Sequence, residues 1–126
     1  MEPADGIARL GFTGWYERQL HQAHAYLATC FLCIVLVAVG VETVGADTSR
    51  AGILLAAALI LAAGALGIHS LQRYRAILQR AAAFARAAIC QSCRTYGSIR
   101  VLEQESPAPP RLKVQCAKCG HAWTMG

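Results

Sequence analysis

Residues 25–41 read AYLATCFLCIVLVAVGV and residues 51–68 read AGILLAAALILAAGALGI, and these two uncharged apolar runs decide the fold. The second run, as a helix, rises about 27 Å, close to the thickness of the hydrocarbon core of a bilayer, and predicts a transmembrane helix. The first run reaches spanning length when it is extended from His24 to Ala46, which leaves Glu42 near a headgroup surface.

The composition agrees with membrane insertion. Of the 126 residues, 56% are hydrophobic and only 15% are charged. Such a chain is too apolar to be disordered, and one small soluble core cannot bury so much apolar surface. The surplus must therefore meet lipid or partner subunits.

The segment 42–50 between the runs is short and contains Asp47, so the two spans predict an antiparallel hairpin. Its only basic residue is Arg50, whereas Arg9 and Arg18 precede the hairpin and nine basic residues follow it. The positive-inside rule then puts both termini in the cytoplasm, in a multi-pass protein of the cytoplasmic membrane. Near the cytoplasmic surface, an aromatic belt is expected from Trp15, Tyr16, Tyr26 and Tyr74.

Two alternatives remain for the apolar runs. They could be buried helices of a soluble bundle, although both are apolar all round rather than along one stripe. The first could instead be a signal-peptide core at Leu27–Val41, cleaved after Ala46, although the region before it is long and weakly basic for that purpose.

Residues 70–89 predict a basic juxtamembrane helix that continues the second span. The segment lacks Pro and Gly, and apolar side chains recur at three- and four-residue spacing at Leu71, Tyr74, Leu78, Ala81, Ala85 and Ala88, with Ile77 and Phe84 beside the stripe. Its arginines are expected to set the topology and to attract anionic lipids; they are Arg73, Arg75, Arg80 and Arg86. Small residues four apart in the second span predict close packing on another helix, at Gly52/Ala56, Ala58/Ala62 and Ala63/Gly67.

Two cysteine pairs give the strongest chemical signal. Cys90-Gln-Ser-Cys93 and Cys116-Ala-Lys-Cys119 are C-x2-C knuckles whose turns can bring four thiolates around one ion, and Gly120 can take the positive φ that such a turn needs. Residues 95–102, 111–115 and 121–125 predict strands, with a loop at 103–110 and Trp123 packed over the site. So small a domain has almost no core of its own, so bound metal is expected to supply most of its folding free energy.

The tail resembles a known family. Residues 89–125, with Cys90-x2-Cys93 followed by Val114-Gln-Cys116-Ala-Lys-Cys119-Gly-His-Ala-Trp123, are similar to the small bacterial zinc ribbons that end in V-x-C-x-x-C-G-H-x-W. The resemblance implies a zinc-ribbon fold with Cys90, Cys93, Cys116 and Cys119 as zinc ligands. It implies little about activity, and Gln91 stands where the family usually has Pro.

Zinc is the predicted ion, and iron in a rubredoxin-like four-sulfur site is the alternative. Arg94, where a glycine would follow the first knuckle, favours zinc. The cysteines could also be two redox pairs or buried thiols, but a reducing cytoplasm keeps thiolates available to metal. His121 could replace a cysteine, although four thiolates already complete a tetrahedron.

Two weaker groups lie outside the tail. Cys30 and Cys33 share the C-x2-C spacing but sit inside the first span, where they are expected to be small packing residues. His21, His24 and His69 are predicted near the cytoplasmic interface, as hydrogen-bonding residues or, less favoured, as metal or haem ligands.

The sequence therefore predicts a mainly α membrane protein with four parts: a cytoplasmic N-terminal segment (1–23), a transmembrane hairpin (24–69), the basic helix (70–89) and a C-terminal β zinc ribbon (90–126). No nucleophile–His–acid set or phosphate-binding loop is present, so we expect no enzyme. We expect a non-catalytic accessory or assembly subunit that binds integral membrane subunits. A tethered iron electron-transfer protein is the alternative, and a regulatory or nucleic-acid-binding ribbon is less favoured.

Overall fold

The computed structural model of the chain describes residues 2–46 and 49–126. Helices α1 (Pro3–Ala46) and α2 (Arg50–Ala87) are followed by strands β1 (Ile99–Pro107), β2 (Pro110–Cys116) and β3 (Ala122–Met125). This order confirms a helix-rich chain that ends in a small antiparallel sheet. The contacts divide it into two compact units, one made of the residues up to His21 together with Ile77–Gly126, and the other of Gln22–Ala76.

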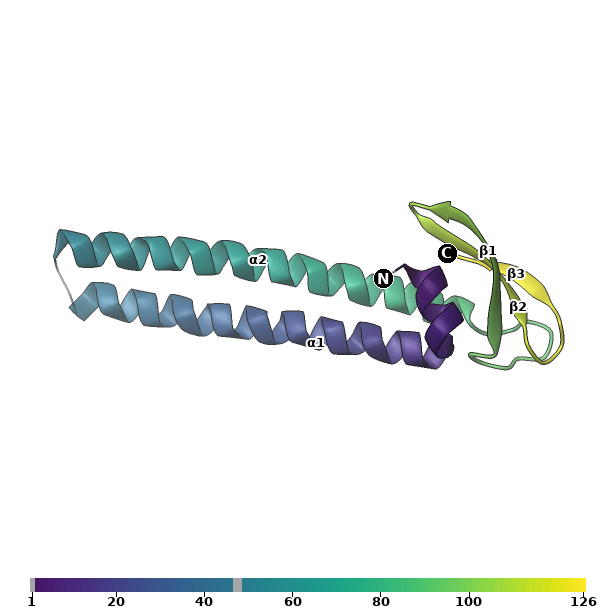
Figure 1. Ribbon diagram of the computed structural model, residues 1–126. Helices are drawn as coiled ribbons and strands as arrows, with labels where there is room; N and C mark the ends of the chain where they lie inside the picture. The colour runs from purple at the N-terminus through teal and green to yellow at the C-terminus, as the bar shows by residue number, and fades with distance from the viewer. Residues whose placement is uncertain (1, 47–48) are drawn as a thin grey trace. The chain divides into compact units, whose positions relative to one another are not determined.

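The unit Gln22–Ala76 is a helical hairpin, with its two helices antiparallel in Figure 1. Helix α2 is unbroken from the second apolar run to Ala87, as the sequence predicts for a helix that continues beyond the span. The connection is shorter than the predicted segment 42–50, because α1 continues to Ala46. Ser49 caps α2, since its hydroxyl accepts a hydrogen bond from the Gly52 N–H at 3.1 Å. Asp47, predicted in the connection, lies outside the described residues.

Small residues mark the contact between the two helices of the hairpin. Ala56 and Ala63 are buried, and a Cβ added to Gly67 would lie 3.3 Å from the Cβ of Cys33. A Cβ added to Gly40 would lie 2.8 Å from Ile60 Cγ1, so a larger residue there would force Ile60 or the helices to shift. Two of the three predicted small-residue pairs thus include a buried contact position, and the partner helix is the first span. Ala58 and Ala62, the third pair, are exposed.

The outer surface of the hairpin is strongly apolar. Both helices are long and apolar enough to cross a membrane, and only 11% of the most apolar window of each is buried. Leucines such as Leu54, Leu55 and Leu61 are more than 70% exposed in the isolated chain. A core helix of a soluble protein would instead be mostly buried, and so large an exposed apolar surface is unusual for a soluble monomer.

The second unit begins with a bent helix. Within α1 the backbone leaves the helical conformation at Gly11, where φ is 73° and ψ is 169°. This region of backbone space is essentially restricted to glycine, because a Cβ would collide with the backbone. Gly11 therefore lets residues 3–10 form a short helix separate in direction from the rest of α1.

The hydrophobic core of this unit joins three parts of the chain. It contains Ile7, Phe12 and Trp15 from the N-terminal segment, Phe84 and Ala88 from the end of α2 and its exit, and Leu112, Val114 and Met125 from the sheet. The ribbon itself supplies only Leu112, Val114 and Met125, and the sequence pattern did not predict that residues outside the ribbon complete this core. Trp15 was predicted in a membrane-interface belt, but it is only 1% exposed and meets Phe84 edge-on at 5.5 Å.

The end of α2 presents its predicted apolar stripe to this core. Ala81, Phe84 and Ala88 are nearly fully buried, at the three- and four-residue spacing of a helix face. Phe84, expected beside the stripe, lies at its centre. The sequence pattern therefore found the buried face but not its middle.

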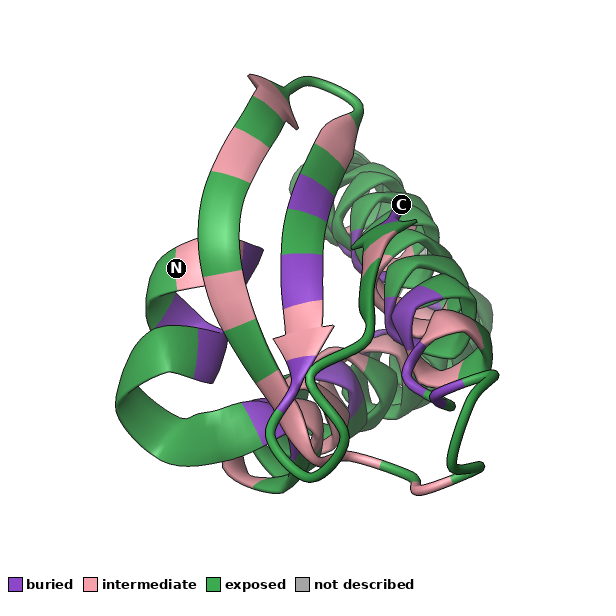
Figure 2. Ribbon diagram, turned by 90° about the vertical axis from the view of Figure 1, so that its right-hand side faces the viewer, coloured by how far each residue is buried: buried purple, intermediate pink, exposed green. Residues whose placement is uncertain are grey.

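The sheet has the order β1-β2-β3, with both neighbouring pairs antiparallel. Buried residues alternate with more exposed ones along β2, as the colours of the strand show in Figure 2. Leu112, Val114 and Cys116 are the buried ones, and Leu112 and Val114 belong to the core. The predicted loop at 103–110 is mostly strand, because two bulges in β1 keep this polar stretch paired with β2 as far as Pro107↔Pro110. The strand predicted from residue 95 begins only at Ile99, since the preceding residues form the first cysteine knuckle.

Candidate metal centre

The first knuckle starts directly from the end of α2. The Ala88 carbonyl accepts a hydrogen bond from the Gly97 N–H at 3.2 Å, and the Ala87 carbonyl accepts one from Trp123 Nε1 at 2.8 Å. These bonds satisfy carbonyls that the helix end would otherwise leave unpaired. The Trp123 side chain, expected over the cysteines, packs against the core and ties β3 to the helix. The cysteines therefore follow a fixed helix end rather than a flexible linker.

The two knuckles share one hydrogen-bond pattern. The Arg94 N–H donates to the Cys90 carbonyl at 2.8 Å, and the Gly120 N–H donates to the Cys116 carbonyl at 3.1 Å. In each knuckle the N–H of the first cysteine donates to a carbonyl five residues later, at 3.1 Å for Thr95 and 2.8 Å for His121. The same local fold thus occurs twice, once after a helix and once after a strand.

Both knuckles close with a residue in the left-handed region. Gly120 has φ +78°, as the sequence predicts, and Arg94 occupies the equivalent position with φ +55°. For a residue with a Cβ this conformation costs roughly 1–2 kcal/mol. Because Arg94 adopts the turn that a glycine would adopt, its identity does not discriminate between metals.

The four cysteine sulfurs converge. All four Sγ atoms of Cys90, Cys93, Cys116 and Cys119 lie within 4.8 Å of one another. Cys90 Sγ and Cys119 Sγ are 3.4 Å apart, and Cys93 Sγ and Cys116 Sγ are 3.6 Å apart. A tetrahedral ion with metal–sulfur bonds of about 2.3 Å needs sulfurs about 3.8 Å apart, so the donor set fits such an ion.

Backbone and side-chain groups of the knuckles favour the ionised form of two of these thiols. The Cys93 thiol donates a hydrogen bond to the Thr95 hydroxyl oxygen at 3.2 Å, and the same hydroxyl can donate to the sulfur once it is ionised. The Thr95 hydroxyl and the Thr95 N–H together lower the pKa of Cys93 to about 6. The N–H groups of Cys119 and Lys118 lower the pKa of Cys116. Donors aimed at sulfur thus stabilise thiolates, the form that binds metal.

The pKa of Cys119 is shifted in the opposite direction, because of the neighbouring sulfurs. The His121 N–H acts to lower the pKa of Cys119, but contacts with Cys90, Cys93 and Cys116, together with desolvation, outweigh it and raise this pKa to about 11. Four negative sulfurs so close together repel one another strongly unless a positive ion lies between them. The arrangement is therefore suited to a divalent metal and poorly suited to four free thiolates.

Other predicted ligands do not join this cluster. Within residues 2–46 and 49–126, the four knuckle cysteines are the one group of three or more potential ligand side chains close enough to hold an ion. His21, His24, His69 and His121 are not in it. The His121 ring instead stacks on Trp123, with the ring centroids 5.9 Å apart.

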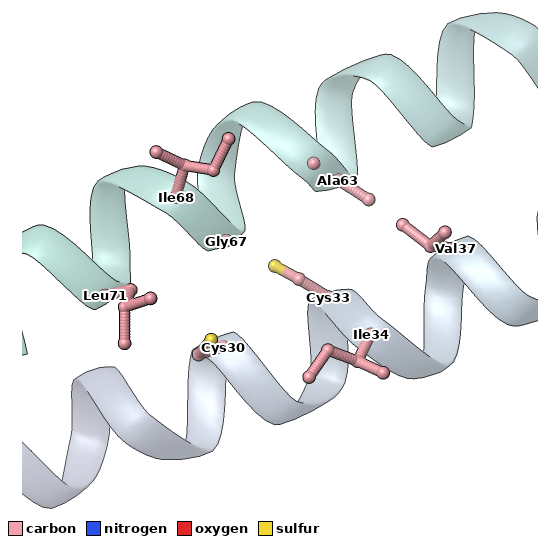
Figure 3. Close-up of a pocket in the computed structure, with 9 residues that line it drawn as sticks. Cys30, Cys33, Ile34, Val37, Ala63, Gly67, Ile68 and Leu71 are labelled. Carbon is pink, nitrogen blue, oxygen red and sulfur yellow. The ribbon is translucent and has the colours of Figure 1, made fainter.

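Cys30 and Cys33, in the first apolar run, lie in the hairpin. Cys33 is buried and Cys30 partly buried, and both line an apolar groove of about 280 Å³ between α1 and α2. Figure 3 shows the Cys33 sulfur pointing toward Gly67. This placement agrees with the expectation of small packing residues.

Comparisons of the chain with protein-family models, with curated proteins and with solved structures gave no match. The likeness to zinc ribbons therefore rests on the knuckle residues and on the geometry of their sulfurs.

Sequence reasoning missed the residues that hold the site from outside the ribbon. Ile7, Phe12 and Trp15 belong to its core, yet the N-terminal segment was expected only to lie in the cytoplasm. A signal was present, because Phe12 and Trp15 are three residues apart on one helix face and follow Gly11, a residue suited to a turn.

Proposed function

We propose that this chain is a membrane-anchored zinc-ribbon protein that acts as a non-catalytic accessory or assembly subunit of a larger inner-membrane complex. The observation that carries the metal assignment is the convergence of four sulfurs at near-tetrahedral spacing. Zinc is the proposed ion because a closed four-thiolate set is the usual structural zinc site. Cys90, Cys93, Cys116 and Cys119 would hold it, and the ion would cross-link the two knuckles.

The exposed surface of the hairpin supports membrane anchoring. An isolated hairpin with Phe31 at 66% and Leu61 at 74% exposure would aggregate in water, so lipid or partner helices must cover it. Two antiparallel spans would bring the chain back to the side of the membrane from which it started.

The shared core supports the proposed topology. Residues 3–16 and 81–126 contribute to one core, so both must lie on the same side of a membrane. Cleavage of a signal peptide after Ala46 would remove Ile7, Phe12 and Trp15 from that core, which disfavours a secreted protein. With both ends in the cytoplasm, Arg73 and Arg75 would lie near anionic headgroups.

A docking role is supported by how firmly the ribbon is held. The helix end, the N-terminal segment and the sheet share one core, and Trp123 adds a hydrogen bond to the helix. A rigid cytoplasmic domain joined to an apolar hairpin suits recognition of other membrane subunits better than it suits catalysis. The electron-transfer alternative would need iron in place of zinc at the same sulfurs.

The metal assignment is tested by purifying the full chain in mild detergent under reducing conditions and measuring bound metal. One zinc ion per chain is expected, in a colourless protein. Cys93→Ser/Cys119→Ser should lose the metal, whereas Cys30→Ser/Cys33→Ser, a matched change in the other C-x2-C pair, should keep it. A red, iron-loaded protein would establish the electron-transfer alternative, and metal-free wild-type protein would refute both.

The subunit role is tested separately in the native membrane. The chain should resist alkaline extraction and should migrate in native gels as part of a larger assembly after gentle solubilisation. A photo-crosslinking residue at Leu61, on the exposed face, should capture an integral membrane protein, whereas one at Ala63, on the hairpin contact, should not. A chain that is soluble, or that migrates alone, would contradict the proposal.

A further inference from the structure

Two short sulfur–sulfur contacts in the metal centre join one knuckle to the other. Cys90 Sγ lies 3.4 Å from Cys119 Sγ, and Cys93 Sγ lies 3.6 Å from Cys116 Sγ. A disulfide bond is about 2.05 Å long, so each pair needs an approach of about 1.5 Å to become covalent. Side-chain rotation within the knuckle turns can supply a movement of this size.

Each of these pairs combines an exposed cysteine with a buried one. Cys93 and Cys119 are exposed, whereas Cys90 and Cys116 are at most 2% exposed. A small oxidant would therefore meet Cys93 or Cys119 first. The buried partner would then lie next to the oxidised sulfur, as a resolving cysteine does in redox-sensitive proteins.

We infer that the metal centre is an oxidation site, at which hydrogen peroxide converts the four thiolates into the disulfides Cys90–Cys119 and Cys93–Cys116 and releases the zinc ion. This inference rests on the proposed zinc site. It gives the ribbon a second covalent state, in which two disulfides replace the cross-link that the metal provides.

The chemistry balances for each pair. An exposed thiolate attacks one oxygen of hydrogen peroxide, the O–O bond breaks, and with one proton the products are a sulfenic acid and water. The buried thiolate then attacks the sulfenic sulfur, the S–O bond breaks, and with a second proton the hydroxyl leaves as water. Each pair gives two electrons to one peroxide, so the whole site uses two peroxides and four protons, and yields two disulfides, four waters and free Zn²⁺.

The cross-linked form should keep the fold of the ribbon. Both disulfides would join the same two knuckles that the metal joins, next to the hydrogen bond from the Ala117 N–H to the Ser98 carbonyl at 2.9 Å. Disulfides within each knuckle would leave the two knuckles without a cross-link in place of the metal. The pairing therefore decides whether oxidation preserves or destroys the domain.

The experiment uses the zinc-loaded full chain in detergent, treated with increasing hydrogen peroxide in the presence of a colorimetric zinc indicator. Zinc release should be complete near two peroxides per chain, and the tryptophan emission should stay that of folded protein. Cys30→Ser/Cys33→Ser should behave identically, which excludes the hairpin cysteines as the oxidised groups.

Tryptic digestion of the oxidised protein then identifies which cysteines are paired. Cleavage after Arg86, Arg94, Lys113 and Lys118 leaves Cys90 and Cys93 in one peptide, 87–94, and puts Cys116 and Cys119 in two others, 114–118 and 119–126. The expected product is peptide 87–94 joined to both others, and fragmentation between Cys90 and Cys93 should assign Cys90 to Cys119.

Three results would overturn the inference: peptide 114–118 joined to 119–126 with 87–94 separate, the reverse assignment of Cys90 and Cys93, or retention of zinc in a large excess of peroxide. None of these results contradicts the proposal that the reduced cysteines bind zinc. The proposed function fails by a different result, namely reduced wild-type protein that contains no zinc before any oxidant is added.

Discussion

Gly11 offers a direct test of how the N-terminal segment supports the ribbon. At φ 73° and ψ 169° it occupies a region that is essentially closed to residues with a Cβ, although nothing lies within 4 Å of the place a Cβ would take. Gly11→Ala therefore introduces backbone strain and no collision with a neighbouring side chain. The expected cost is about 1–3 kcal/mol, or roughly a 5- to 150-fold loss in the folding equilibrium of this unit.

The assay follows from the positions of the tryptophans. The chain has two, Trp15 and Trp123, and both belong to the unit that contains the ribbon. Urea unfolding of zinc-loaded full chain in detergent, followed by tryptophan emission, therefore reports this unit and not the hairpin. With a cost of about 2 kcal/mol and a urea dependence of about 1.5 kcal/mol per molar, the midpoint of Gly11→Ala should fall by about 1 M.

The matched control is Gly64→Ala. Gly64 also has nothing within 4 Å of a new Cβ, but it is helical and lies in the hairpin unit. This variant should leave the tryptophan transition unchanged. An unchanged midpoint for Gly11→Ala would refute the reasoning, because it would mean that the short helix at 3–10 contributes nothing to the stability of the ribbon core.

Three further predictions concern the ribbon. Both Arg94 and Gly120 occupy positions that require a positive φ. Arg94→Gly should therefore raise the free energy of unfolding, measured in urea, by up to about 1 kcal/mol, and Gly120→Ala should lower it by about 1–2 kcal/mol. Equal effects of the same sign would contradict the shared turn. Trp123→Phe should destabilise the unit by about 1–2 kcal/mol, because it removes the hydrogen bond from Trp123 Nε1 to the Ala87 carbonyl. Trp15→Phe is the control, since Trp15 Nε1 has no hydrogen-bond partner among the described residues and the substitution removes no such bond. Hydrogen bonding to Thr95 lowers the pKa of Cys93 to about 6. In the metal-free chain, the rate of Cys93 alkylation by iodoacetamide should therefore increase with pH through a midpoint near pH 6, because only the thiolate reacts. A midpoint above pH 8 would contradict the role of Thr95.

The helices were predictable because their signals are local. Uncharged runs longer than a few turns, and a stretch such as 70–89 without Pro or Gly, favour helix wherever they occur. The paired spacing of the four cysteines was equally informative, because convergence on one ion is demanded by chemistry and not by the rest of the fold. These features can be recognised in the sequence without knowing which other segments lie nearby in the fold.

What the sequence did not reveal depends on contacts between distant segments. Trp15 near an apolar run is typical of a membrane interface, and only the meeting of residues 3–16 with the sheet shows that it is a core residue. The polar stretch Glu103–Ser106 looks like a loop, yet pairing with β2 makes it a strand. Arg94 gave no sign of its positive φ, because the turn imposes that conformation on whatever residue stands there.

The non-contiguous core has a consequence for biogenesis. The ribosome synthesises Ile7 and Phe12 well before Met125, so both long helices are made before the partners of these residues in the sheet exist. The core of the ribbon can therefore be completed only after both helices of the hairpin have been synthesised, and the four cysteines can meet only after synthesis has passed Cys119. A chain whose synthesis stops before the second knuckle would lack Met125 of that core and two of the four clustered cysteines.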